Sequence, residues 1–133
     1  MAFRKVGAVI LLVSNMDKSI KFYKDTLGLP LKRKSKDWTE FFKDGTVVAL
    51  HPAKKKSMVG SGAGMLVGFM VTDMDATVKE LKAKKVKFFK KPKEESFGKH
   101  AIIEDPDGHL ISIAEIKTEL EEGFDMLGMF GTD

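Results

Sequence analysis

Glu40 and His51 are the ionisable side chains whose spacing is best suited to chemistry, and Trp38 belongs with them. All three flank Asp44–Gly45, a dipeptide typical of a two-residue β-hairpin turn. If those two residues form the turn, Trp38 and Glu40 fall on the same face of the hairpin as His51. The spacing therefore predicts one face that carries a carboxylate, an imidazole and the only indole of the chain.

Aromatic and ionisable groups on one face are typical of a surface that binds a small molecule. Trp38 and Phe42 would stack on a planar ligand, while Glu40 and His51 would orient it. Burial against the two rings would also raise the pKa of the Glu40 carboxyl toward neutrality, where a general base works best. The alternative is a face that simply points into water.

The opposite face of this hairpin is apolar and needs a cover. Phe41, Val48 and Leu50 fall on it, with Thr39 as the one polar residue. Such a face is suited to packing beneath a helix.

A sequence repeat supplies that helix. Val13–Lys21 and Val71–Lys79 match at a constant offset of 58 residues, with four identities, and each predicts the end of a strand followed by a helix. Asn15 or Asp17 is the predicted N-cap of the first helix, and the equivalent residues cap the second. Gly28 fits the C-cap of the first helix, where a positive φ suits glycine.

Short apolar or extended segments surround both helices and predict strands. In the first copy they are 6–13, 31–34, 39–42 and 46–51, and in the second they are 65–71, 88–90, 100–103 and 110–115. A turn is predicted at Asp105–Gly108, and a flexible linker at the glycine-rich 60–64. We therefore expect one domain over 1–133, with a first module at 5–59, a second at 65–116 and a tail at 117–133.

The composition narrows the class of protein. A chain of 133 residues with 43% apolar composition suits one domain, and the sequence contains no long uncharged apolar run. From its first residues we expect no signal peptide. The absence of cysteine excludes disulfides, thiolate metal sites and a cysteine nucleophile. The net charge of +4 comes from scattered lysines without interleaved aromatic residues, which predicts no nucleic-acid partner. We expect a cytoplasmic protein with no membrane partner.

Three motifs together resemble the vicinal oxygen chelate superfamily, which includes glyoxalase I, bleomycin-resistance proteins and extradiol dioxygenases. They are Phe22–Leu29 (FYKDTLGL) after the first helix start, the Asp44–Gly45 hairpin and Asp105–Gly108 (DPDG). The resemblance spans about residues 5–116. It implies an α+β fold in which two βαβββ modules form a curved, mixed, mostly antiparallel sheet around a cup, usually in a homodimer.

The resemblance also implies four metal-ligand positions, and this chain departs from the pattern at each. By position they are Ala8, Ala49, Leu66 and Ser112, none of which is a good ligand for a divalent ion. We therefore predict no metal and no cofactor, and no direct transfer of glyoxalase, dioxygenase or epimerase chemistry. A relocated metal site that uses Glu40 and His51 is the less favoured alternative.

Three functions stay open. The first is metal-independent binding of a small planar or anionic molecule. A cationic drug is a less favoured ligand, because family members that bind cationic drugs tend to be acidic and this chain is basic. The second is a lyase, isomerase or dioxygenase-type enzyme related to glyoxalase, with Glu40 or His51 as the catalytic base. The third is a protein-interaction module, since the tail is an acidic amphipathic segment. The predicted cup is lined by Ala8, Ile10, Leu12, Trp38, Phe42, Ala49, Leu66, Met70 and Ser112.

Overall fold

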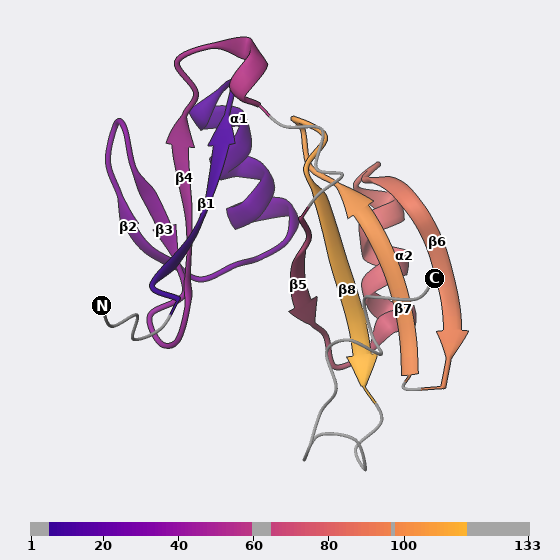
Figure 1. The fold of residues 1–133 in the computed structure, drawn as a ribbon. Coiled ribbons are helices and arrows are strands. Elements are labelled where there is room, and N and C mark those ends of the chain that lie inside the picture. Colours follow the sequence, from indigo (N-terminus) through magenta and orange to yellow (C-terminus); the bar gives the residue numbers. More distant parts are fainter. Residues whose placement is uncertain (1–5, 60–64, 97, 117–133) are drawn as a thin grey trace. The chain divides into compact units, whose positions relative to one another are not determined.

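The computed structural model describes residues 6–59, 65–96 and 98–116, and their contacts divide the chain into two compact units. The first unit consists of the first module together with the turn at residues 105–109, and the second unit consists of the rest of the second module. The predicted linker at 60–64 and the predicted tail at 117–133 lie outside the described residues (Figure 1).

The first unit is a βαβββ module. Its elements are β1 (Ala8–Val13), α1 (Met16–Lys21), a π-helical turn η1 (Phe22–Thr26), β2 (Leu31–Lys34), β3 (Thr39–Phe41), β4 (Val47–Pro52) and a short 3-10 turn η2 (Lys56–Met58). The sheet order is β1-β4-β3-β2. β1 runs parallel to β4, and the other two neighbouring pairs are antiparallel (Figure 1).

The repeat places both helix starts as predicted. Of the two candidate caps, Asn15 is the one used in α1, where its side chain accepts a hydrogen bond from Lys18 N at 3.0 Å. The N-cap of α2 (Met74–Ala83) is Asp73, whose side chain accepts a hydrogen bond from Ala76 N. The first helical segment ends before Gly28, whose φ of +75° is the left-handed conformation expected at a C-cap.

The core of the first unit lies between the sheet and α1. The sheet contributes the fully buried residues Val13, Phe41 and Leu50, and η1 contributes the fully buried Tyr23. The Tyr23 and Phe41 rings lie 6.1 Å apart between centroids. Thr39 pairs with Leu50 and Phe41 with Val48, which confirms the predicted apolar face and its register.

The predicted two-residue turn at Asp44–Gly45 is wrong. The register ends at Phe41 and Val48, so residues 42–46 form a longer loop, in which Phe42 has a φ of +72°. Phe42 N–H donates to Pro30 O and Val47 N–H donates to Gly7 O. Because both amides bond elsewhere, the predicted Phe42–Val47 pair does not form, while the pairs behind it keep their register.

The second unit repeats the βαβββ pattern. Its strands are β5 (Val67–Met70), β6 (Lys87–Glu95), β7 (Gly98–Glu104) and β8 (Leu110–Ile116), in the order β5-β8-β7-β6. β5 runs parallel to β8 and the other pairs are antiparallel. Met74 and Leu81 of α2 are buried, as are Ala101, Ile103 and Ile111 of the sheet. β6 is an edge strand, which tolerates Pro92 and its lysines.

The α+β class, the two βαβββ modules and the mostly antiparallel pairing are confirmed. Strand β6 covers Lys87–Glu95 and is longer than the predicted strand 88–90. The prediction was too short because register shifts on both sides of Lys90 interrupt the alternation of side chains along the strand. No helix among the described residues is long and apolar enough to cross a membrane.

Candidate ligand-binding site

One face of the first sheet gathers most of the predicted site residues. Ile10 lies opposite Ala49, which lies opposite Glu40, and Leu12 lies opposite His51. Because residues paired across strands share a face, these side chains form one surface, here called the Trp38 face. Its members are Ala8, Ile10, Leu12, Trp38, Glu40, Ala49 and His51.

The Trp38 face has an apolar floor that solvent can reach. Ile10 is 50% exposed, whereas its neighbour Leu11, on the core face, is 9% exposed. Ala49, between Ile10 and Glu40 on this face, is fully buried, so the exposed part of the floor is Ile10. A surface of this kind can bury an apolar ligand without first moving the strands.

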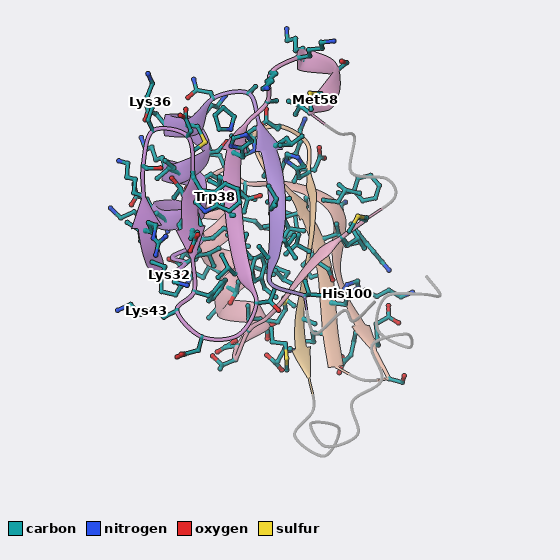
Figure 2. All side chains as sticks on the ribbon, turned by 60° about the vertical axis from the view of Figure 1, so that its left-hand side comes forward. Lys32, Lys36, Trp38, Lys43, Met58 and His100 are labelled. Carbon is teal, nitrogen blue, oxygen red and sulfur yellow. The ribbon has the colours of Figure 1, made fainter. Side chains whose placement is uncertain are left out.

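Trp38 is held on this face by Glu40. The indole Nε1–H donates to Glu40 Oε2 at 2.5 Å, and Lys32 Nζ lies 3.6 Å from the other carboxylate oxygen. Trp38 is half-buried beside the strands of the first unit, whereas Lys32 and Lys36 are exposed (Figure 2). The hydrogen bond fixes the plane of the indole ring.

The same contact corrects the predicted ionisation of Glu40. Its pKa is lowered, chiefly by the hydrogen bond from Trp38 and further by the positive charges of Arg33 and Lys32, which together outweigh the effect of burial. Glu40 is thus a stable carboxylate and a weak proton acceptor. The expectation of a raised pKa was wrong because it counted the Trp38 ring as apolar surface and ignored its N–H donor.

His51 is oriented from the loop before β3. Its Nδ1 lies 2.7 Å from the carbonyl oxygen of Asp37. A carbonyl oxygen only accepts hydrogen bonds, so Nδ1 carries a proton, and in the neutral form of the ring Nε2 is then the acceptor. The imidazole ring lies 5.9 Å from the Trp38 ring, between centroids, at an interplanar angle of 56°.

Phe42 differs from the rest of the predicted set. It follows the last residue of β3 with a positive φ, so the alternation that places Trp38 and Glu40 on one face does not extend to it. Its role as a stacking residue stays a prediction.

The predicted residues of the second unit lie at or before β5 and on β8. Gly68 lies opposite Ser112 and Met70 opposite Ala114, so Met70 and Ser112 share a face, and Leu66 precedes β5. Met70 is 58% exposed, while Ser112 is fully buried. That these residues and the Trp38 face line one cup stays a prediction.

Ser112 has a partner that sequence reasoning missed. Its Oγ lies 2.6 Å from Nε2 of His100, which is also buried, on the neighbouring strand β7. The signal was available in principle, because Ile102 pairs with Ser112 and His100 lies two residues away on the same face.

The four positions implied for a metal do not fit one. Ala8, Ala49 and Leu66 offer no donor atom, and the Ser112 hydroxyl is already hydrogen bonded to His100. Within residues 6–59, 65–96 and 98–116, no group of three or more His, Asp or Glu side chains is arranged to hold an ion. The alternative metal site at Glu40 and His51 has no third His, Asp or Glu ligand beside it in the same ranges.

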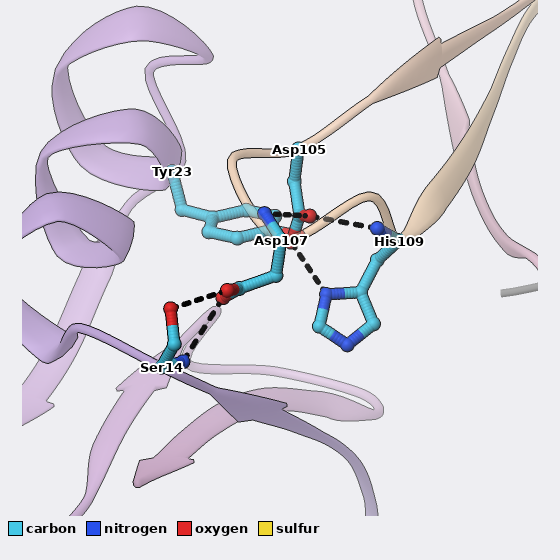
Figure 3. Close-up of polar contacts among 5 residues, drawn as sticks. All are labelled: Ser14, Tyr23, Asp105, Asp107 and His109. Carbon is cyan, nitrogen blue, oxygen red and sulfur yellow. Dashed lines mark hydrogen bonds and ion pairs between the residues drawn. The ribbon is translucent and has the colours of Figure 1, made fainter. Parts of the chain in front are cut away.

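The DPDG turn is attached to the first unit by a second polar cluster, shown in Figure 3. Tyr23 Oη donates to Asp105 Oδ2 at 2.7 Å, and His109 Nδ1 lies 2.8 Å from the same oxygen. The backbone amides of Asp107 and His109 donate to Oδ1 at 2.9 and 2.8 Å. Ser14 donates to Asp107 through both its backbone amide and its hydroxyl.

The charges of this cluster are mutually stabilised. Burial would raise the pKa of Asp105, but the hydrogen bonds from His109 and Tyr23 outweigh burial and lower it. The hydrogen bond to Asp105 raises the pKa of His109, and burial is the main reason that the pKa of Tyr23 is raised far above its usual value. Because each of these groups is committed to the turn, we assign the cluster to folding and not to ligand binding.

Two βαβββ modules, each with a four-stranded mixed sheet, define the fold class of this chain. The chain belongs to the Glyoxalase/Bleomycin resistance protein/Dioxygenase superfamily, whose family model matches residues 5–113.

Two relatives illustrate the range of the family. The chain is 34% identical over 128 residues to the protein YraH of Bacillus subtilis, with 82% of this chain and 96% of YraH covered. It is 33% identical over 126 residues to a probable chloroplastic lactoylglutathione lyase of Arabidopsis thaliana, with 84% of this chain covered. The chain spans only 36% of the length of the Arabidopsis protein.

Solved structures share the fold. TnmS3, an antibiotic binding protein from a Streptomyces species, is 25% identical, with a TM-score of 0.68 and with 88% of this chain and 99% of TnmS3 covered. A glyoxalase-related enzyme from Fulvimarina pelagi is 19% identical, with a TM-score of 0.70 and with 85% and 88% of the two chains covered. The second likeness concerns the fold alone.

Proposed function

We propose that this protein binds a small planar molecule, neutral or anionic, on the Trp38 face without the help of a metal ion. The observation that carries the proposal is the Trp38 indole, which Glu40 holds in one orientation beside a solvent-reachable apolar floor. A ring fixed in this way loses little conformational freedom when a flat ligand stacks on it, so more of the stacking energy contributes to affinity.

Charge supports a neutral or anionic ligand over a cationic one. Arg33 lies opposite Glu40 across β2 and β3, and Lys32 pairs with the Glu40 carboxylate, so the single negative charge of this face is compensated. The antibiotic-binding function of TnmS3 supports small-molecule binding as a class of activity on this fold.

Catalysis is the second candidate, and His51 is the residue that favours it. Its proton lies on Nδ1 against Asp37 O, so Nε2 is in the form required of a general base, whereas Glu40 is poorly suited to that role. A glyoxalase-related lyase or isomerase would use His51 in this way. Assembly as a homodimer and a cytoplasmic location stay predictions.

Calorimetry of the full chain against 2-naphthol, 2-naphthoate and a planar cation of similar size tests the proposal. Ile10→Asp places a charge on the floor, while Met58→Asp alters a residue of similar exposure in η2 of the same unit, at 46% against 50%. We expect Ile10→Asp to weaken binding of the neutral and anionic probes at least about tenfold, and Met58→Asp to leave it unchanged.

Three outcomes decide between the candidates. Equal loss in both variants, or a preference for the cation, would contradict binding on the Trp38 face. Mass spectrometry and NMR spectroscopy of the recovered probe separate binding from catalysis, because a lyase changes the mass of its ligand, an isomerase changes its structure, and a binding protein returns it intact.

A further inference from the structure

The hydrogen-bonding groups of the Trp38 face differ in what they still offer to a ligand. Glu40 has a donor of this chain beside each carboxylate oxygen, with Trp38 Nε1–H on Oε2 and Lys32 Nζ near Oε1. The Trp38 N–H is in turn committed to Glu40. The polar function of these two residues is therefore to orient the indole ring.

His51 is different because only one of its ring nitrogens is committed. The Asp37 carbonyl oxygen holds the proton on Nδ1, which leaves Nε2 as an acceptor with no partner among the residues described in the structure. The His51 side chain is half-buried, on the strand next to the Trp38 loop, with its ring 5.9 Å from the indole. A fixed acceptor thus lies beside a fixed aromatic plane.

We propose that His51 Nε2 selects, among planar ligands, those that carry a hydrogen-bond donor such as a phenolic O–H or a ring N–H; this inference rests on the proposed function. Both recognition groups are locked before the ligand arrives, one by Glu40 and the other by Asp37 O. A preorganised acceptor discriminates well, because a ligand without a donor would leave it partly desolvated and unpaired.

The tautomer of His51 is tested without any ligand. In the full chain labelled with nitrogen-15, the imidazole nitrogen signals distinguish a protonated from an unprotonated ring nitrogen. We expect the proton on Nδ1 at neutral to mildly alkaline pH. A proton on Nε2 would overturn the inference, since the face would then offer a donor and not an acceptor.

The ligand preference is tested with a matched pair of probes, 2-naphthol and 2-methoxynaphthalene. They share the flat ring system, but only 2-naphthol has an O–H donor, and the extra methyl group of the ether favours apolar burial. We expect 2-naphthol to bind about five- to tenfold more tightly, as one net hydrogen bond allows. The NMR signal of the indole N–H group belongs to Trp38 alone, since the sequence has one tryptophan. A shift of this signal on addition of a probe indicates binding near Trp38.

Variants assign the preference to His51. His51→Phe keeps a flat ring and removes the acceptor, so both probes should bind with nearly equal affinity. His51→Gln restores an acceptor and should recover part of the preference. His109→Gln, which alters a histidine of the DPDG cluster, is the control and should keep the preference of the unmodified protein.

The outcomes separate this inference from the proposed function. If both probes shift the Trp38 signal with equal affinity, or if His51→Phe keeps the preference, His51 does not select the ligand while the binding face survives. If neither probe shifts the Trp38 signal, planar ligands do not bind on this face, and the proposed function and the inference are both refuted.

Discussion

Replacing Tyr23 by phenylalanine removes one oxygen atom from a fully buried position and keeps the aromatic ring. The ring contacts with Phe22 and Phe41 do not need the hydroxyl. What is lost is the 2.7 Å hydrogen bond to the Asp105 carboxylate. Because hydrogen bonds to charged groups contribute about 1.5–3 kcal/mol, we expect the free energy of unfolding to fall by about 2 kcal/mol at pH 7.

The pH dependence of this loss identifies its cause. The pKa of Asp105 is lowered in the folded protein, so the stability that its partners provide is present above the ordinary carboxyl pKa of 3.8. It is lost as the pH falls through the lowered value, because the carboxylate then becomes neutral. The cost of Tyr23→Phe should therefore be constant from pH 5 to pH 8 and shrink below about pH 4.

Urea unfolding followed by fluorescence is the assay, since the only tryptophan, Trp38, lies in the same unit as Tyr23. Asp105→Asn, alone and combined with Tyr23→Phe, completes a double-mutant cycle that isolates the pair. The reasoning is refuted if the two substitutions are additive, or if Tyr23→Phe costs the same at pH 3 as at pH 7.

Two further substitutions concern polar groups, one partly buried and one fully buried. His109→Gln should lower the free energy of unfolding more at pH 5 than at pH 9, which urea unfolding at both pH values measures. The pKa of His109 is raised in the folded protein, chiefly by its hydrogen bond to Asp105. The stability that His109 contributes is therefore complete below about pH 6.5 and is lost as the pH rises through the raised pKa. Thr39→Val should raise the free energy of unfolding by about 1 kcal/mol, because the fully buried Thr39 Oγ1 has no hydrogen-bond partner among the described residues; a lower urea midpoint would show that the hydroxyl is satisfied.

The register of the first hairpin was predictable even though its turn was not. The alternation of side chains along the strands places Thr39, Phe41, Val48 and Leu50 together on the core face. A shift of one residue in the strand register would have turned these side chains to the other face. The turn has no such constraint. It depends on where the Phe42 and Val47 amides find acceptors, and those acceptors belong to Pro30 and Gly7, distant in sequence.

The DPDG cluster shows a different limit. The sequence predicts a turn at 105–108 from its residue types, since aspartate, proline and glycine each favour turn conformations. It does not indicate that Asp105 accepts a hydrogen bond from Tyr23, 82 positions earlier, or that Ser14 donates to Asp107. Such contacts depend on tertiary structure, and periodicity carries no information about them.

The repeat makes particular residues of the two modules equivalent. Ala49 and Ser112 are equivalent by register, since each lies opposite the equivalent residue of the first strand of its module, Ile10 or Gly68. Around Ala49 the neighbouring polar groups fix the orientation of Trp38 and His51, on a face that includes the half-exposed Ile10.

At Ser112 the polar groups bond to one another instead, as the buried His100–Ser112 contact shows. The buried His100–Ser112 pair stabilises the interior of its own module, whereas His51 is half-buried and has one ring nitrogen committed to a backbone carbonyl. The two modules thus differ at an equivalent position, and the difference is consistent with the first module as the one that carries the proposed ligand-binding face.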